Sequence, residues 1–182
     1  MQNPPLRISE LGAGDGWLLL QLAREWALDG VSADAELVDL HYLLSGETRH
    51  AFVELGWTVA QVTLDARMWL ARPALVEADL ILANLFLHHF EDEALREMFE
   101  FIAERAECFI ACEPRRGDGV LAVSRLLWLA GLGPVTRHDA PISVRAGFEG
   151  RELTALWPDR DHWLITEGPA GRFSHCFVAR RL

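Results

Sequence analysis

The chain has 182 residues, of which 51% are hydrophobic and 24% charged, a composition typical of one compact domain with a full apolar core. Its formal net charge is -10 at pH 7, and all 17 basic residues are arginine. A surface this acidic repels phosphate, so we expect neither nucleic acid nor an anionic membrane as a partner. A small molecule or a protein is the expected partner.

The first residues lack the basic and apolar regions of a signal peptide, and no apolar run approaches the roughly 20 residues of a membrane span. The three cysteines are Cys108, Cys112 and Cys176. Two of them share one face of a predicted strand, too far apart to bridge, so an odd set like this does not indicate a disulfide framework. We expect all three to be reduced and buried, without a metal role, in a cytoplasmic protein.

The first apolar run, at 6–11, ends in Gly12, Gly14 and Gly16, and an amphipathic segment at 17–28 follows at once. This order predicts a strand, a tight turn and a helix. Further strands are predicted at 35–40, 57–64, 78–87 and 107–113, and further helices at 48–55 and 91–106. Because strands and helices alternate, we expect a parallel sheet with helices on both faces.

The last third of the chain has a different pattern. Helices are predicted near 120–132 and over 149–157. Strands at 162–167 and 172–180 are separated by the turn formers of 168–171, which predicts an antiparallel hairpin. Nothing in the sequence suggests a second domain.

The glycine turn has the spacing G-x-G-x-G, whereas a dinucleotide fingerprint is G-x-G-x-x-G. Glu10 stands just before the turn and Asp15 stands within it. Each carboxylate would repel a pyrophosphate by about 1 kcal/mol per close charge pair in water. S-adenosylmethionine carries a sulfonium and an ammonium and no phosphate, so it suits this turn better than NAD does.

Five predicted strands each end in a polar residue, and parallel sheets bind ligands beyond these carboxyl ends. The five residues are Glu10, Asp39, Asp65, Asn84 and Glu113. A chain that emerges into water also carries such residues, but a set of five favours a site. Asp39 lies 23 positions after Gly16 (39 minus 16), near the expected place of an acid that accepts both ribose hydroxyls.

The motif Glu10-Leu-Gly-Ala-Gly-Asp-Gly16, together with Asp39 and Asp65, resembles class I S-adenosylmethionine-dependent methyltransferases over roughly 6–113. The resemblance implies a Rossmann-like, mostly parallel seven-stranded sheet with a C-terminal antiparallel hairpin, in a single domain over 1–182. It implies that Asp39 binds the ribose, that Asp65 and the Ala66 N–H meet the adenine, and that Glu10 and Gly12 lie beside the methionine portion. The full set of implied cofactor residues is Glu10, Gly12, Ala13, Gly14, Gly16, Asp39, Asp65, Ala66 and Asn84.

The stretch Leu87-His-His89 resembles that of many small-molecule methyltransferases and differs from the Asn-Pro-Pro-aromatic motif of enzymes that methylate amide or adenine nitrogens. A phenolic acceptor must lose a proton, and histidine suits that role, so His88 and His89 are the candidate bases. His138 is a third candidate, for contact with the substrate. A structural hydrogen bond is the alternative for each histidine.

Two arginines after the fifth predicted strand, Arg115 and Arg116, are candidates to clamp a carboxylate or enolate on the substrate. Solvated surface arginines are the alternative. Because Asn84 and Glu113 together supply only one acid, we expect no metal of the kind that catecholate enzymes use.

The segments 135–148, 150–153 and 173–177 resemble bacterial methyltransferases associated with type III polyketide synthases, which implies a phenolic or polyketide-like acceptor and methylation of oxygen. Members of that group carry helices before the first strand, whereas here the strand starts within about six residues of Met1. Either the start is truncated, or 115–157 covers the site, or the site is open. A non-catalytic cofactor-binding partner or regulatory subunit is therefore the alternative, and a homodimer stays open.

Overall fold

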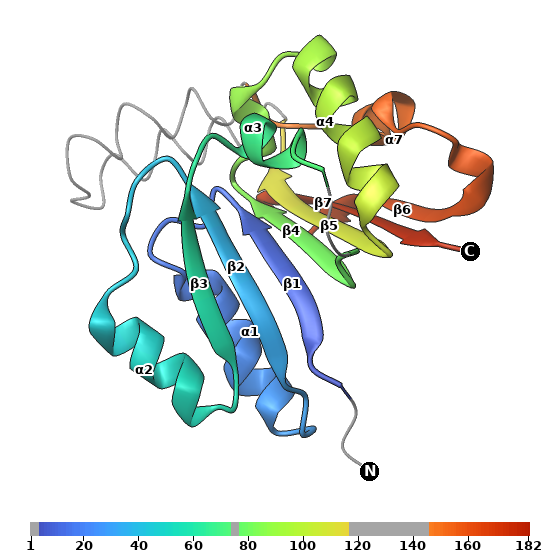
Figure 1. The fold of residues 1–182 in the computed structure, drawn as a ribbon. Coiled ribbons are helices and arrows are strands. Elements are labelled where there is room, and N and C mark those ends of the chain that lie inside the picture. Colours follow the sequence, from blue (N-terminus) through green and yellow to red (C-terminus); the bar gives the residue numbers. More distant parts are fainter. Residues whose placement is uncertain (1–3, 74–76, 117–145) are drawn as a thin grey trace, which may run out of the picture.

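The structure is a computed structural model that describes residues 4–73, 77–116 and 146–182. Its middle layer is a seven-stranded sheet of order β3-β2-β1-β4-β5-β7-β6 (Figure 1). The strands are β1 (Leu6–Leu11), β2 (Ala33–Asp39), β3 (Thr58–Thr63), β4 (Leu80–Asn84), β5 (Cys108–Pro114), β6 (Trp163–Ala170) and β7 (Ser174–Arg181). The first five are parallel, and β7 pairs antiparallel with both β5 and β6. This confirms the predicted Rossmann-like sheet with its C-terminal hairpin.

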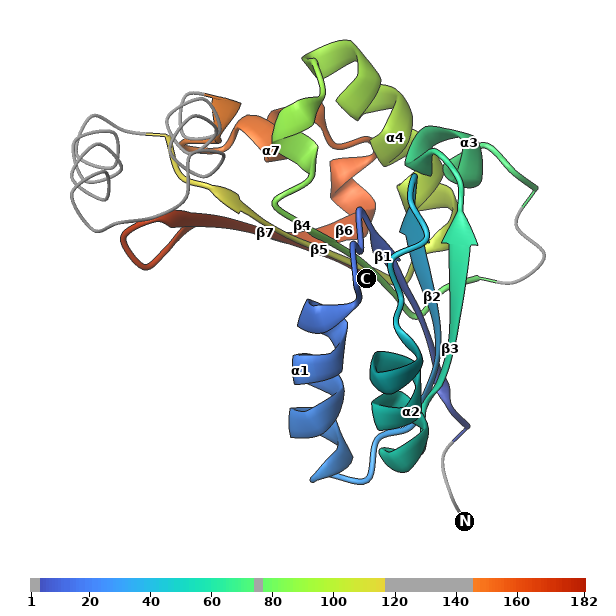
Figure 2. The same cartoon turned by 90° about the vertical axis from the view of Figure 1, so that its left-hand side faces the viewer.

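Helices cover both faces of the sheet (Figure 2). One face carries α1 (Trp17–Ala27) and α2 (Gly46–Glu54), and the other carries α3 (Ala66–Leu70), α4 (Asp92–Arg105) and α7 (Glu152–Leu156). Two short 3-10 turns, η1 (Leu87–His89) and η3 (Arg160–His162), complete the described elements. The described part of the chain holds no helix with the length and apolarity that a membrane crossing requires.

Two apolar clusters fill the space between sheet and helices. Beneath α4 and α7, the rings of Phe99, Phe109, Trp157 and Phe177 pack with centroids 5.2 to 6.1 Å apart. The second cluster lies beneath α1 and α2 and includes Trp57. Since side chains alternate along a strand, each buried strand supplies residues to both clusters.

The structure corrects several predicted boundaries. β4 stops at Asn84 rather than at 87, because Leu85 adopts a left-handed conformation with φ of 52° and the chain turns there. Helix α3 was not predicted. β6 continues through Pro169 to Ala170, which an edge strand tolerates because it has no partner on one side. The predicted helix near 120–132 lies outside the described residues.

The cysteines also differ from the expectation. All three thiols are free, but each residue is partly exposed rather than buried. Cys108 and Cys112 lie on β5 and Cys176 on the hairpin strand β7, on the sheet face that carries α1, where Cys108 packs at the border of the cluster beneath that helix.

Candidate functional site

The sheet reverses its strand order between β1 and β4. From β1 the chain continues to β2 and β3 on one side, while β4 and β5 extend the sheet on the other side (Figure 1). In open α/β sheets the crevice at such a switch point, beyond the carboxyl ends of the strands, is the usual ligand site. The glycine turn at 12–16 and the loop after β4 both lie at this edge.

Hydrogen bonds from main-chain N–H groups tie the glycine turn to the carbonyl and carboxylate groups at the end of β2. The N–H groups of Gly12 and Ala13 donate to the Val38 carbonyl at 2.9 and 3.1 Å, and the Gly14 N–H donates to Asp39 Oδ2 at 2.9 Å. Gly12 has a φ of 68°, and a Cβ there would overlap the Phe86 ring of the loop after β4. A Cβ on Gly14 would instead point into open space. The turn is therefore packed beneath and open above.

The start of α1, directly after this turn, is occupied by a carboxylate. Asp15 Oδ1 accepts from the Trp17 N–H at 3.0 Å. This is the kind of N–H group that holds a pyrophosphate in dinucleotide sites. An anionic ligand would have to displace Asp15, so the local charge favours a cation.

Glu10 is buried below the turn, with 2% of its surface exposed. Within the described residues its Oε2 has no hydrogen-bond partner. Burial, and next the charge of Asp15, raise the pKa of Glu10 to about 8, although the Leu19 backbone N–H acts in the opposite direction. Buried polar atoms are nearly always paired, so this oxygen is an exception that a cationic ligand would explain.

Asp39 ends β2, as predicted, whereas β3 stops at Thr63 and Asp65 follows two residues later, and each carboxylate also holds local backbone. Asp39 Oδ1 accepts from the His41 N–H at 3.0 Å. Asp65 Oδ1 accepts from the N–H groups of Arg67 and Met68 at 2.8 and 3.3 Å, so Asp65 is the N-cap of α3 and directly precedes Ala66. A carboxylate offers about four lone-pair sites, so these bonds leave capacity for ligand hydroxyl or amino groups. Their expected ribose and adenine contacts stay predictions.

The buried pair His88 and Glu113 organises the loop after β4, where Asn84 ends the strand. Glu113 Oε1 accepts from the N–H groups of Phe86 and Leu87 at 3.0 and 2.9 Å, and Oε2 lies 2.8 Å from His88 Nδ1. The side chain of Glu113 is 0% exposed and that of His88 is 5% exposed. With Glu113 ionised, Nδ1 is the donor and Nε2 keeps a lone pair that can take a proton. The sequence placed Glu113 at a strand end but did not predict this pairing.

His89 differs from its neighbour. It is exposed, and its ring centroid lies 4.1 Å from that of His88. The partial burial that remains, followed by the charge of His88, lowers the pKa of His89. The structure therefore brings both predicted histidines to the carboxyl edge, one oriented by a carboxylate and the other accessible to solvent.

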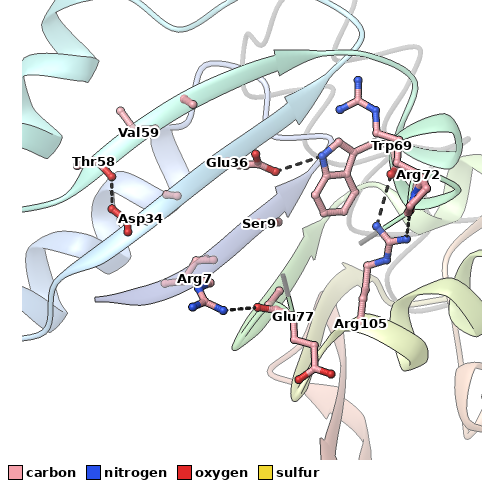
Figure 3. A pocket seen from close by; sticks show the side chains of 15 residues that line it. Arg7, Ser9, Asp34, Glu36, Thr58, Val59, Trp69, Arg72, Glu77 and Arg105 are labelled. Carbon is pink, nitrogen blue, oxygen red and sulfur yellow. Dashed lines mark hydrogen bonds between the residues drawn. The ribbon is translucent and has the colours of Figure 1, made fainter. Parts of the chain in front are cut away.

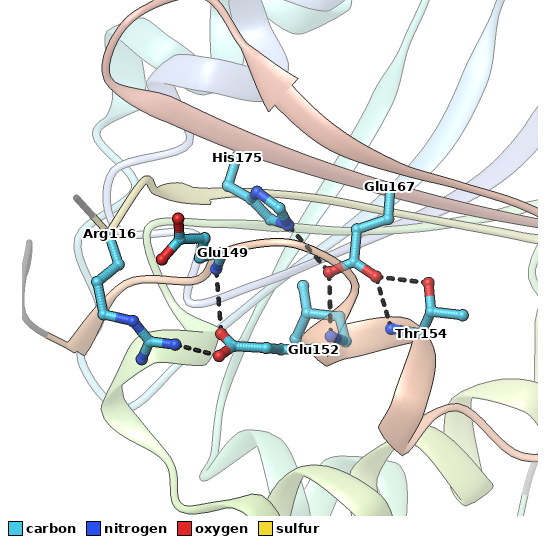
Figure 4. A network of polar contacts seen from close by, with 7 residues as sticks. Arg116, Glu149, Glu152, Thr154, Glu167 and His175 are labelled. Carbon is cyan, nitrogen blue, oxygen red and sulfur yellow. Dashed lines mark hydrogen bonds and ion pairs between the residues drawn. The ribbon is translucent and has the colours of Figure 1, made fainter.

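The Arg116 side chain and the Arg115 backbone have partners in the described structure, and Figure 4 shows those of Arg116. Arg116 forms an ion pair with Glu152, whose Oε2 also accepts from the Glu149 N–H at 3.0 Å. The Arg115 N–H donates to the Phe173 carbonyl at 2.7 Å and extends the pairing of β5 with β7. A substrate role for either arginine stays a prediction, and His138 lies outside the described residues.

A second buried pair, Glu167 and His175, was missed by the sequence reasoning. Glu167 Oε1 lies 2.9 Å from His175 Nε2, and the carboxylate also accepts from the N–H groups of Leu153 and Thr154 at 3.0 and 2.7 Å (Figure 4). Both side chains are 1% exposed or less. Strand alternation is the sequence signal that could have placed Glu167 inside, because Glu167 shares the inward face of β6 with Trp163.

A cavity of about 590 Å³ lies on the sheet face below α3, away from the glycine turn (Figure 3). It includes Ser9 and Glu36 from the middle of β1 and β2, and Glu36 accepts from Trp69 Nε1 at 3.2 Å. At its border the Arg105 guanidinium donates to the carbonyls of Trp69, Leu70 and Arg72, at the C-terminal end of α3. None of the sequence-predicted site residues lines this cavity, so the candidate site remains the carboxyl edge.

Within residues 4–73, 77–116 and 146–182, no three or more His, Cys, Asp or Glu side chains are grouped as a metal site requires.

The fold and this edge together define the class of structure, a Rossmann-like sheet of the methyltransferase type with an acidic glycine turn at the switch point. No family model matches the chain. No curated protein matches its sequence either.

Solved structures of methyltransferases share the fold at low identity. An O-methyltransferase family protein from Burkholderia thailandensis matches with a TM-score of 0.66 and 18% identity, over 97% of this chain and 51% of that one. Magnesium protoporphyrin IX methyltransferase from Synechocystis PCC 6803, with bound SAH, matches with a TM-score of 0.61 and 16% identity, over 98% and 75%. Human N-acetylserotonin methyltransferase, in complex with SAM, matches with a TM-score of 0.54 and 14% identity, over 96% and 47%. The chain thus spans about half the length of the Burkholderia protein.

Proposed function

We propose that the chain binds S-adenosylmethionine at the carboxyl edge of β1, β2 and β3 and transfers its methyl group to a small-molecule acceptor. The observation that carries the proposal is Glu10 Oε2, which is buried beside a turn that is open above Gly14 and has no hydrogen-bond partner in the part of the chain that the structure describes. An ammonium group of the cofactor would give this oxygen a partner and favour ionisation of the carboxyl. The carboxylate of Asp15 at the start of α1 counts against a dinucleotide.

The remaining cofactor residues follow from their positions around the turn. Asp39 would accept the ribose hydroxyls while it keeps its bond to the Gly14 N–H, and Asp65 and Ala66 would meet the adenine. Asn84 ends the neighbouring strand. The solved methyltransferases with bound SAH or SAM have this fold, which supports the choice of cofactor.

For the acceptor we propose an oxygen of a phenolic or polyketide-like molecule. When bound, the cofactor supplies an electrophilic methyl group, and the protein must hold the acceptor in line and remove its proton. His88 suits the second task because the Glu113 carboxylate fixes its ring and leaves Nε2 as the proton acceptor. His89, Arg115 and Arg116 would contact the acceptor at the same edge.

The test is a calorimetric titration of the full chain with S-adenosylhomocysteine (SAH), with NADH as the control. We expect micromolar binding of SAH and none of NADH. Glu10→Gln should weaken SAH binding by about 10- to 100-fold through loss of a charge-assisted bond. Glu25→Gln, an exposed acid on α1, is the matched control and should leave the affinity unchanged. Binding of NADH alone, or equal SAH affinity in Glu10→Gln, would contradict the proposal.

The alternative, a cofactor-binding subunit without its own activity, makes a different prediction. It requires SAH binding without turnover on any member of a panel of phenols and phenolic polyketides. Release of SAH from S-adenosylmethionine that depends on an added acceptor would exclude this alternative.

A further inference from the structure

The register of β5 and β7 brings two thiols together. Cys112 and Cys176 are directly opposite each other in this antiparallel pair, and both are partly exposed. They share the face of the sheet that carries α1, because Cys108 and Ile110, at even positions of the same strand, pack against the core beneath that helix.

The hydrogen bonds around the pair identify its type. The Cys112 carbonyl accepts from the Leu85 N–H, so the peptide groups of Cys112 point toward β4 and away from β7. The bonds between β5 and β7 lie at the odd positions instead, as in Arg115 N–H to Phe173 carbonyl and Arg181 N–H to Glu107 carbonyl. Cys112 and Cys176 therefore form a non-hydrogen-bonded pair.

This type of pair has the geometry that a disulfide needs. Opposite residues at such positions have Cα atoms about 4.5 Å apart and side chains closer than at hydrogen-bonded positions. Disulfides span Cα separations of roughly 4.4 to 6.8 Å. The charge of Cys112 also raises the pKa of the Cys176 thiol, after the larger effect of burial, as expected of neighbouring sulfurs.

We propose that Cys112 and Cys176 form a redox-active dithiol that closes to a cross-strand disulfide when a small-molecule disulfide such as oxidised glutathione is the oxidant. One cysteine thiolate attacks the glutathione disulfide, forms a mixed disulfide and releases one glutathione thiolate. The second cysteine, as its thiolate, then attacks the cysteine sulfur of the mixed disulfide and releases the second glutathione thiolate. Two electrons pass from the protein to glutathione, and the two thiol protons end on the two glutathione molecules.

The pair lies close to the candidate site. Cys112 is opposite Asn84 in β4 and precedes Glu113, while Cys176 follows His175. Closure of the disulfide would lock the ends of β5 and β7 beside the two buried His–Glu pairs. The proposal concerns the thiols themselves and does not depend on the proposed methyltransferase activity.

Cys108 provides a matched control on the same strand. It lies on the same face of β5, four positions earlier, but its opposite residue is Arg180 rather than a cysteine. It is equally a free, partly exposed thiol. It can form a mixed disulfide with glutathione but has no opposite thiol to resolve it.

The experiment equilibrates the full chain in buffers of reduced and oxidised glutathione, blocks the remaining thiols by alkylation, and maps the cross-linked peptides by mass spectrometry without reduction. We expect a Cys112–Cys176 peptide in the wild type and in Cys108→Ser, with Cys108 of the wild type either alkylated or in a mixed disulfide with glutathione. Cys112→Ser and Cys176→Ser should carry only mixed disulfides with glutathione. Circular dichroism of each variant verifies that it is folded.

Three results from the peptide map would overturn the proposal. They are three alkylated thiols in the oxidised wild type, a stable mixed disulfide at Cys112 or Cys176 in the wild type, or an intramolecular bridge that contains Cys108. A disulfide-linked dimer on a non-reducing gel, in place of the intramolecular peptide, would overturn it too.

Discussion

Burial of Glu10 lowers the stability of the free chain, whereas the same carboxyl would strengthen the binding of a cationic ligand. A carboxyl group whose pKa rises from 4.5 to about 8 on folding stays protonated in the folded chain while the unfolded chain has already ionised. Its favourable contribution is complete below about pH 4.5 and is lost as the pH rises toward the folded pKa. Retention of such a residue costs stability, which a role in binding a cation would explain.

Glu10→Gln should therefore stabilise the free protein near pH 8 while it weakens SAH binding. The expected gain in the free energy of unfolding is on the order of a few kcal/mol at about pH 8 and smaller at about pH 6, because the neutral amide pays no ionisation cost. Urea unfolding at both pH values measures it. A variant that is less stable than the wild type at about pH 8 would show that Glu10 has a structural partner.

The SAH affinity of the wild type should also depend on pH through the same group. Below the pKa of about 8 the bound ammonium must first displace the Glu10 proton, so affinity should rise as the pH increases from about 6 toward 8. The rise should be absent in Glu10→Gln. Calorimetry in buffers of different ionisation enthalpy would detect the released proton, and a pH-independent wild-type affinity would remove Glu10 from the ammonium site.

His88→Ala should lower turnover by roughly 10²- to 10⁴-fold, the usual contribution of a general base, while SAH affinity changes little. The orienting Glu113 carboxylate is the reason to expect a larger loss here than in His89→Ala. His50→Ala, on the exposed side of α2, is the control. If His89→Ala were the more damaging change, the accessible histidine would be the base and His88 would position the loop.

At the scale of elements, α7 is a helix of five residues held at its start by another element. The Glu167 carboxylate of β6 accepts from the Leu153 and Thr154 N–H groups and from the Thr154 hydroxyl, groups that a helix of this length cannot pair within itself. His175 from β7 binds the same carboxylate. The hairpin thus positions α7 above the aromatic cluster that contains Trp157.

Glu167→Ala should cost about 3 kcal/mol or more of unfolding free energy, because it leaves three donors and a buried histidine without their acceptor. Urea unfolding monitored by tryptophan fluorescence would report both the loss and the displacement of Trp157. Glu107→Ala, a half-exposed acid that pairs with Arg181, is the matched control and should cost less than about 1 kcal/mol. Equal costs would show that Glu167 does not hold α7.

Elements with a strong apolar pattern were predictable from the sequence, and contacts between elements were not. β1, α1 and α4 match their predicted ranges within a residue, since periodicity and glycine positions determine them locally. The glycine turn, Asp39 and Asp65 could be named as candidates because spacing in the sequence carries that information. The pairing of Glu113 with His88 depends on the register of β4 and β5, which no single stretch of sequence encodes. Helix α3 is too short for a periodic pattern and depends on the Asp65 cap.

At the scale of the whole molecule, the net charge of -10 adds to the acidity of the candidate site. A field of this sign attracts cations over a distance comparable to the Debye length, about 10 Å at 0.1 M salt. S-adenosylmethionine carries one positive charge more than SAH, because its sulfonium becomes a neutral thioether. The protein's field should therefore favour the substrate form of the cofactor over its product.

This preference should weaken as salt is added. The ratio of the Kd of SAH to the Kd of S-adenosylmethionine should fall several-fold between about 0.02 and 0.5 M salt, since screening removes the long-range attraction and leaves the local contacts. Parallel calorimetric titrations at constant pH measure the ratio. Sinefungin, a cofactor analogue with an amine at the methyl-bearing position, is the control and should follow the substrate rather than the product. A ratio that does not change with salt would assign the discrimination to contacts in the site alone, with no part for the charge of the molecule.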